Sequence, residues 1–396
     1  FSPTRIFLDA PLSLPGVYKG LENCTNYHFR KADIETKAMS PMFLGGLAAR
    51  AMELSAFCRD SGSEVYETYP KMMAQRFNLK DFGYKSSKSA IKECALRLNS
   101  CIKDPIDFNL AYVAESIAIK ESKLSIRSGN ESQLYWADSS GKKTKYVLLY
   151  LHGFSASPEE GAPVHLSFAK KYGMNFYAPL LQGHGLVESE PMIDFTAEGF
   201  INSAKNAIRL ARLMGDSVIV MSTSTGCTAA LFLASDPNNQ IHSLICYSPN
   251  IRVFDKRASL LTGPWGIQIA RLVKGGDYNV WQAPVGVEQY WHLKYRLEAV
   301  IEMQRLLETT MNKETFEKIK CPTFIGYYYK NEEEQDKVVS VPRILEMYEQ
   351  LGSRKKRKVA FADAGVHAMV SSLFCNSTQK ISDSTYAFAD SVLGVK

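Results

Sequence analysis

A run of small and hydroxylated residues, Ser222-Thr223-Ser224-Thr225-Gly226, is the clearest place for chemistry in this sequence. It lies between the β-branched stretch SVIVM and a stretch rich in Ala and Leu, a pattern that predicts a strand, a tight turn and a helix. Only small residues fit around such a turn, which would hold the Ser224 hydroxyl clear of the backbone as a nucleophile. The alternative is that Ser224 belongs to a Ser/Thr-rich helix N-cap without chemistry.

A serine hydroxyl becomes a good nucleophile only when a base takes its proton, so the sequence has to supply a histidine. His367, in Gly365-Val366-His367, follows the last predicted strand, where its ring can reach over the edge of a sheet. His152 and His184 compete for this role, but each lies in a turn flanked by glycine, which favours a structural role. We therefore predict that His367 is the base.

An acidic residue has to hold that histidine in the correct tautomer. Asp336 follows the predicted strand FIGYYY and is the candidate. Several glutamates precede it in a stretch that the pattern indicates is a solvated acidic loop. Two of them, Glu333 and Glu334, remain lesser alternatives to Asp336.

Two backbone amides are candidates for binding the negative charge that forms when an acyl group is attacked. The helix N-terminus places the Thr225 amide beneath the Ser224 hydroxyl. A second buried strand, KYVLLY, runs into the turn Leu151-His152-Gly153-Phe154-Ser155, whose glycine lets the backbone bend. This predicts the Phe154 amide as the second oxyanion donor, the alternative being an ordinary glycine turn.

The elements that must position these residues alternate between strands and helices from about residue 122 onward. Such alternation predicts an α/β fold, a mostly parallel sheet with helices on both faces. The segments ESKLSIRSG and SQLYWAD are predicted to form a hairpin at its start. The later elements are the strand KYVLLYLHGF, a helix near 162–172, the strand MNFYAPLL, a helix at TAEGFINSAKNAIRLARLMG, the strand SVIVMS, a helix from 225, and the strands HSLICYS, CPTFIGYYY and KVAFADA.

The first part of the chain has a different period. Apolar residues recur there at three- and four-residue intervals, which predicts helices over 33–60, 63–77 and 86–102. We therefore expect a mainly helical N-terminal extension over 1–115, followed by the α/β domain over 116–396.

A long segment between Pro249 and Cys321 also interrupts the alternation and is predicted to be an inserted cap, at about 250–318. Its three tryptophans are candidate substrate-binding residues. The alternative is that the cap only shields the site from water. The tryptophans are Trp265, Trp281 and Trp291.

Together, the serine turn, the HGF turn, the QGHG segment, the Asp-x-Val-Val acid loop and the terminal Gly-Val-His resemble the α/β-hydrolase superfamily. The sequence is most similar to the bacterial carboxylesterases and monoacylglycerol lipases over about residues 120–396, whereas 1–115 resembles no family. The resemblance implies an α/β-hydrolase fold with five site residues: the nucleophile Ser224, the acid Asp336, the base His367 and the oxyanion donors Phe154 and Thr225. Two features depart from the family pattern. Ser222 replaces the commoner glycine, and Lys330–Gln335 lengthens the acid loop.

The reaction that the resemblance implies is hydrolysis of a small-molecule ester through an acyl-enzyme, without a metal or an organic cofactor. Short to medium acyl esters or monoacylglycerol-like lipids are the expected substrates. Two alternatives remain open: a peptidase or amidase that uses the same triad, and a non-catalytic scaffold protein with a hydrolase fold.

The composition argues against two classes of partner. A net charge of +6 over 396 residues is mild, and the basic cluster at 354–358 is typical of the solvated approach to a strand, so no nucleic acid is expected to bind. No run approaches the ~18 consecutive apolar residues of a transmembrane helix, so no integral membrane segment is expected.

Cysteine usage bears on the compartment. Four of the eight cysteines, Cys24, Cys58, Cys94 and Cys101, lie in the first quarter of a chain that begins at Phe1. We predict at least one disulfide among them, other than Cys94–Cys101, whose spacing on a helix is too long to bridge. This favours export to the periplasm or the medium, the alternative being a cytoplasmic protein. No cysteine pair has the CxxC spacing of a metal site.

Overall fold

The computed structural model describes residues 5–8, 64–67, 108–138 and 142–393, and the chain divides into two compact units, Phe1–Ile106 and Asp107–Lys396. The first unit contains two described strands, β1 (Arg5–Leu8) and β2 (Glu64–Glu67), which pair in parallel. The helix predicted over 63–77 is therefore wrong at β2. Valine and tyrosine favour a strand there, and pairing with the distant strand β1 outweighs the helix-like spacing of apolar residues. The rest of that prediction, the other predicted N-terminal helices and the four N-terminal cysteines lie outside the described residues.

The second unit is built on a seven-stranded sheet with the order β11-β10-β7-β6-β4-β5-β3. All neighbours are parallel except the edge strand β3, which is antiparallel to β5. The strands are β3 (Gln133–Tyr135), β4 (Thr144–Leu151), β5 (Asn175–Ala178), β6 (Gly215–Thr223), β7 (Ile241–Tyr247), β10 (Thr323–Tyr327) and β11 (Lys356–Ala360). The mostly parallel sheet predicted from the sequence is confirmed.

The predicted hairpin ahead of this sheet is wrong. Its second segment supplies β3, which pairs with β5, whereas Ile126 in its first segment forms an isolated bridge with Leu186. The residues 127–130 do turn the chain, because the Asn130 amide donates to the Arg127 carbonyl at 3.0 Å. Each segment pairs with residues far along the chain, and the local alternation of apolar residues cannot specify such long-range pairing.

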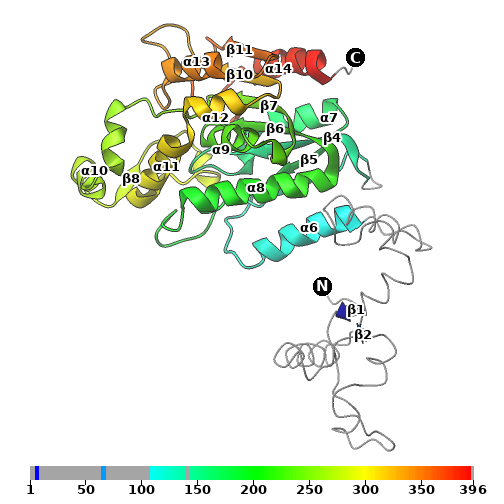
Figure 1. Ribbon diagram of the computed structural model, residues 1–396. Helices are drawn as coiled ribbons and strands as arrows, with labels where there is room; N and C mark the ends of the chain where they lie inside the picture. Colours follow the sequence, from blue (N-terminus) through cyan, green and yellow to red (C-terminus); the bar gives the residue numbers. More distant parts are fainter. Residues whose placement is uncertain (1–4, 9–63, 68–107, 139–141, 394–396) are drawn as a thin grey trace, which may run out of the picture. The chain divides into compact units, whose positions relative to one another are not determined.

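Helices cover both faces of the sheet, as predicted, because alternate residues of the central strands supply two separate apolar cores. In β4, Val147, Leu149 and Leu151 belong to one core, and Leu148 and Tyr150 belong to the other. Figure 1 shows α8 and α9 lying across the sheet on one side. The first core is covered by α6 (Phe108–Glu121), α8 (Ala197–Met214), α9 (Thr225–Ala234) and α13 (Val341–Gln350), and the second by α7 (Val164–Lys171) and α14 (Thr378–Leu393).

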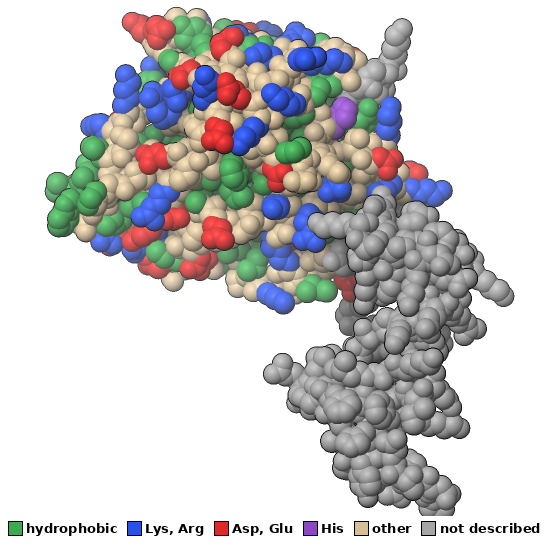
Figure 2. All heavy atoms as spheres, viewed as in Figure 1, with side chains coloured by type: hydrophobic (Ala, Val, Ile, Leu, Met, Phe, Trp, Pro, Cys, Tyr) green, Lys and Arg blue, Asp and Glu red, His purple; other side chains and the backbone are tan. Residues whose placement is uncertain are grey.

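The segment between β7 and β10, all of it described, adds no strand to the main sheet. It contains the 3-10 helices η5 (Lys256–Thr262) and η6 (Val287–Gln289), the antiparallel pair β8 (Tyr278–Val280) and β9 (Lys294–Arg296), and the helices α10 (Gly266–Lys274), α11 (Leu297–Thr310) and α12 (Lys313–Lys318). Figure 2 shows exposed hydrophobic side chains gathered over α10. The exposed residues of this region include Leu260, Trp265, Leu272 and Val273.

Candidate active site

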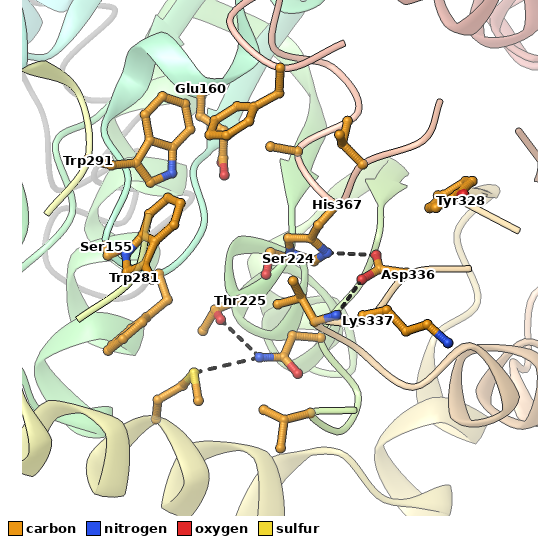
Figure 3. A pocket seen from close by; sticks show the side chains of 18 of the residues that line it. Ser155, Glu160, Ser224, Thr225, Trp281, Trp291, Tyr328, Asp336, Lys337 and His367 are labelled. Atoms are coloured by element: carbon orange, nitrogen blue, oxygen red, sulfur yellow. Dashed lines mark hydrogen bonds and ion pairs between the residues drawn. The ribbon is translucent and has the colours of Figure 1, made fainter. Parts of the chain in front are cut away.

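Four turns meet at one edge of the sheet because they come directly after the carboxyl ends of parallel strands. They come after β4, β6, β10 and β11 and supply Phe154, Ser224, Asp336 and His367, respectively. All four residues line one cavity of about 580 Å³, and Figure 3 shows its interior. The structure therefore brings together residues that are separated by more than half of the chain.

Ser224 occupies a strained turn between β6 and α9. Its backbone has φ 53° and ψ −120°, a left-handed conformation that a residue with a side chain rarely adopts. The turn is held by the Ser224 amide, which donates to the Tyr247 carbonyl at 3.0 Å, and by the Cys227 amide, which donates to the Ser224 carbonyl at 3.0 Å. The Ser224 side chain makes no helix-capping hydrogen bond. Its hydroxyl is thus not used as an N-cap, the alternative considered from the sequence.

The small residues on either side of Ser224 have clear packing reasons. A side chain on Gly226 would place its Cβ 2.1 Å from the Leu151 carbonyl oxygen, so only glycine fits there. Ser222, which stands in the place of the commoner glycine, is fully buried and directs its hydroxyl at the Cys227 and Cys246 sulfurs, at 3.3 and 3.8 Å. Since these two small thiols leave room for a hydroxyl, the departure from the family pattern does not disturb the turn.

His367 and Asp336 are joined by a short hydrogen bond. The distance between His367 Nδ1 and Asp336 Oδ2 is 2.7 Å, and the Asp336 side chain is fully buried. Asp336 Oδ1 accepts hydrogen bonds from the amides of Val338 at 2.8 Å and Val339 at 3.1 Å. With Nδ1 donating to a carboxylate, Nε2 is the ring nitrogen free to accept a proton. Figure 3 shows Ser224 on the side of the imidazole away from Asp336.

The electrostatics of this pair favour a basic histidine. Burial opposes the charged imidazolium, but the charge and hydrogen bond of Asp336, with a smaller contribution from Glu160, raise the pKa of His367 above its ordinary value. Burial likewise opposes the Asp336 carboxylate, but His367 and the two backbone amides more than offset it, so the pKa of Asp336 is lowered. The protonated form of His367 is therefore stabilised, which suits a residue that accepts a proton.

The competing histidines lie elsewhere and are held by the backbone. His152 Nε2 accepts a hydrogen bond from the Leu181 amide at 3.1 Å, and His184 Nδ1 lies 2.8 Å from the Gln182 carbonyl. Their rings pack edge to face with centroids 4.9 Å apart, and burial lowers the pKa of both. Neither lines the cavity.

The competing glutamates lie on the exposed part of the acid loop. Glu334 forms an ion pair with Lys330 at 2.8 Å, and Glu333 is exposed to solvent. Neither lines the cavity, whereas Asp336 does. The lengthened loop therefore places these two carboxylates away from His367.

Phe154 and Thr225, whose backbone amides are the predicted oxyanion donors, line the cavity together with Ser224. Thr225 is the first residue of α9, so its amide has no partner within that helix. Phe154 comes directly after the bend at Gly153, and its amide donates to no other backbone group within the described part of the chain. Its ring packs edge to face on Phe195 and Tyr295, with centroids 5.1 and 5.3 Å away, which fixes the turn.

Two of the three tryptophans line the cavity. Trp291 is buried and packs edge to face on Phe374, and the Trp281 indole donates to the His292 carbonyl at 3.1 Å. Both are labelled on one wall in Figure 3. Trp265, the third candidate, precedes α10 and is 69% exposed, and it does not line the cavity.

Sequence reasoning missed two residues that act on the site. Ser248 donates its hydroxyl to the His367 carbonyl at 2.9 Å and so anchors the loop that carries the histidine. Glu160 is a buried carboxylate that lines the cavity and accepts a hydrogen bond from the Gly153 amide at 2.6 Å. An available signal was the acidic pair Glu159-Glu160, placed directly after the glycine turn in an otherwise apolar and small stretch.

Among the residues that the structure describes, no group of three or more histidine, cysteine or acidic side chains could hold a metal ion. In the same part of the chain, no helix is both long and apolar enough to cross a membrane. Cys227, Cys246, Cys321 and Cys375 are free thiols.

No protein-family model and no curated protein matches this sequence. Among solved structures, one from a study of the metagenome-derived lipolytic enzymes LipS and LipT is similar with a TM-score of 0.55 and 17% identity, covering 67% of this chain and 99% of that one. A monoacylglycerol lipase from Paleococcus ferrophilus is similar with a TM-score of 0.49 and 12% identity, covering 66% of this chain and 98% of that one. Est1E from Butyrivibrio proteoclasticus has a TM-score of 0.44 and 14% identity, covering 68% of this chain and 97% of that one.

The first of these similarities, together with the sheet order, shows that this chain has the α/β-hydrolase fold. At such low identity, the comparison extends to the fold only.

Proposed function

We propose that this chain is a serine hydrolase that cleaves carboxylic esters through Ser224, His367 and Asp336. The observation that carries the proposal is the strained Ser224, which makes no capping bond and shares a cavity with the hydrogen-bonded pair of His367 and the buried Asp336. A strained backbone persists only where the surrounding structure enforces it, and such residues concentrate at functional sites. A non-catalytic scaffold protein would not need a strained serine beside a histidine that is hydrogen-bonded to a buried carboxylate.

The reaction begins when His367 Nε2 takes the Ser224 proton and Ser224 Oγ attacks the ester carbonyl. The Phe154 and Thr225 amides bind the oxyanion, and loss of one such donor typically lowers turnover by about 10²–10³. The C–O bond to the alcohol then breaks, and His367 returns the proton to the leaving alkoxide oxygen. A water molecule, deprotonated by His367, attacks the acyl-enzyme, and the carboxylic acid leaves as Ser224 regains its proton.

The cavity supports short to medium acyl chains as substrates. Its volume of about 580 Å³ is typical of a pocket for a small molecule. Aromatic and aliphatic side chains dominate its walls, so each buried methylene contributes up to ~0.8 kcal/mol until the pocket is full. The lipolytic enzyme that shares the fold belongs to the same broad class of chemistry.

The test is kcat/KM for p-nitrophenyl esters from acetate to palmitate, measured beside an aminoacyl anilide, in the wild type and in Ser224→Ala. We expect turnover that rises from acetate, falls for palmitate and is absent in the variant. Exclusive cleavage of the anilide would assign a peptidase. A folded wild type that turns over no member of the series would return the scaffold alternative.

A further inference from the structure

Glu160 is a second carboxylate inside the cavity, on a different wall from Asp336. It lies in the 3-10 helix η3 (Pro158–Gly161), shortly after the turn that carries Phe154, and it is 3% exposed. Figure 3 shows its carboxylate pointing into the cavity beside Trp291 and on the side of Ser224 away from Asp336. The ester mechanism described above assigns it no role.

The two carboxylate oxygens of Glu160 have different surroundings. Oε2 accepts hydrogen bonds from the Gly153 amide at 2.6 Å and from the Tyr150 hydroxyl at 3.1 Å. A methyl group placed on Gly153 would lie 2.9 Å from Oε1 and 3.1 Å from Ser224 Cβ. A single methyl group would thus touch both side chains, so Oε1 is within reach of a substrate atom only a few bonds from the attacked carbonyl.

Among the described residues, Glu160 forms no ion pair with a lysine, an arginine or a histidine, although the charge of His367 acts on it across the cavity. No lysine or arginine there forms an ion pair with it, and the cavity's other carboxylate, Asp336, is already paired with His367. Lys337 also lines the cavity, but its Nζ lies 3.4 Å from the Glu332 carbonyl and 5.0 Å from the Phe254 ring centroid, on the exposed side. The interior of the cavity therefore presents one carboxylate without an ion-pair partner among the described residues.

The hydrogen bonds that Glu160 makes within the protein do not require its side chain to be a charged carboxylate. A glutamine could accept the same hydrogen bond from Gly153 without the desolvation cost of a buried carboxylate. Burial raises the pKa of Glu160 to about 7, against the opposing effects of the Gly153 amide, His367 and Tyr150. A cation bound beside it would favour the ionised form and offset that cost.

We propose that Glu160 is a substrate-recognition residue, and that the preferred substrate is an ester with a protonated amine on its acyl chain, a few bonds from the carbonyl. The proposal rests on the hydrolase function proposed above. The alcohol oxygen has to face His367, which protonates it, so the group directed elsewhere in the cavity is the acyl chain. The ammonium group donates to Oε1 and forms no covalent bond, and it leaves unchanged on the released carboxylic acid.

Two esters of equal shape test this assignment: p-nitrophenyl 3-aminopropanoate and p-nitrophenyl butanoate, which differ by an ammonium in place of the terminal methyl. Their kcat/KM values are measured at pH 8, with the background taken from Ser224→Ala. The ratio of the two values is the readout, because losses of folding or of oxyanion binding affect both esters and cancel. The variants are Glu160→Gln and, as a matched control, Glu159→Gln, whose carboxylate accepts from Gln133 on the outer side.

We expect the amino ester to exceed the butanoate by about tenfold or more in the wild type, since an ammonium completes a charged hydrogen bond that a methyl leaves unmade. Glu160→Gln should lower the ratio by about tenfold or more, and Glu159→Gln should leave it unchanged. A wild-type ratio of one or less, or a ratio that Glu160→Gln does not lower, overturns the assignment. If Ser224-dependent turnover of the butanoate is found but the amino ester is not preferred, the recognition role of Glu160 is refuted and the hydrolase function is not. Absence of Ser224-dependent turnover of either ester would refute the hydrolase function itself.

Discussion

Replacing Asp336 by asparagine should reverse the tautomer of His367. Asp336 Oδ1 accepts from the Val338 and Val339 amides at 2.8 and 3.1 Å, and Oδ2 lies 2.7 Å from His367 Nδ1. An asparagine has one oxygen, and the two backbone donors hold that oxygen at the Oδ1 position. Its NH₂ group then faces His367 and donates to Nδ1, so the ring proton moves to Nε2.

A ring that is protonated on Nε2 cannot take the Ser224 proton, and the imidazolium also loses its counter-charge. The same exchange in a serine protease lowers kcat by about 10⁴, which corresponds to about 5.4 kcal/mol in the barrier. We expect an effect of that size here. Since both backbone hydrogen bonds to Oδ1 survive, the loop should keep its shape and the protein should stay folded.

The assay is kcat for p-nitrophenyl butanoate, together with the melting temperature of each variant. Glu334→Gln is the matched control, because this glutamate pairs with Lys330 on the outside of the same loop, and its turnover should stay close to that of the wild type. The reasoning is refuted if folded Asp336→Asn keeps turnover near the wild-type level. If Glu333→Gln or Glu334→Gln then loses turnover, the acid role passes to that glutamate.

The pH dependence, the stability and the thiol content of the chain provide three further tests. For a neutral ester, kcat/KM should rise with pH with a midpoint above the ordinary histidine value of 6.5, because Asp336 and Glu160 raise the pKa of His367 against the effect of burial; a midpoint below 6.5 contradicts this. The Glu160 pKa is about 7 when folded and 4.5 when unfolded, so the folded chain keeps a proton that the unfolded chain loses, and stability should fall as pH rises between these values. Urea unfolding at pH 5 and pH 8 should show Glu160→Gln gaining up to about 3 kcal/mol over the wild type, and an equal pH dependence in both proteins would count against a buried, titrating Glu160. We also propose export with at least one N-terminal disulfide, so thiol titration of the natively purified, denatured protein should find fewer than eight free thiols, and eight would favour a cytoplasmic location.

The strands of the main sheet from residue 144 onward and the helices α7, α8 and α9 are predicted from the sequence, whereas α13 and α14 are not. Most residues of strands such as β4 and β6 are buried on both faces, so these strands are continuous apolar runs, unlike amphipathic helices such as α8. The turn around Ser224 is predictable for the same reason, because its small residues stand between two such runs. Since the strands are parallel, the turns at their carboxyl ends are then expected at one edge of the sheet.

Features that depend on distant partners are not predictable in this way. The segment that contains β3 pairs with β5 rather than with its neighbour in sequence, and β2 pairs with a strand more than fifty residues earlier. Trp265 and Trp291 are both tryptophans of the inserted segment, yet only Trp291 lines the cavity. The packing of that segment decides which aromatic side chain points inward. The acidic pair Glu159-Glu160 is visible in the sequence, but the fold alone determines that Glu160 is buried and accepts from the Gly153 amide.

The most direct test of the central claim, that Ser224 is a nucleophile activated by His367, is mass spectrometry of the chain after reaction with a fluorophosphonate. We expect one adduct per chain, located on the peptide that contains Ser224, and none in Ser224→Ala. Labelling should be strongly slowed in His367→Ala, because the serine then lacks its base. A folded wild-type chain that takes no label, or takes it on another residue, would contradict the account.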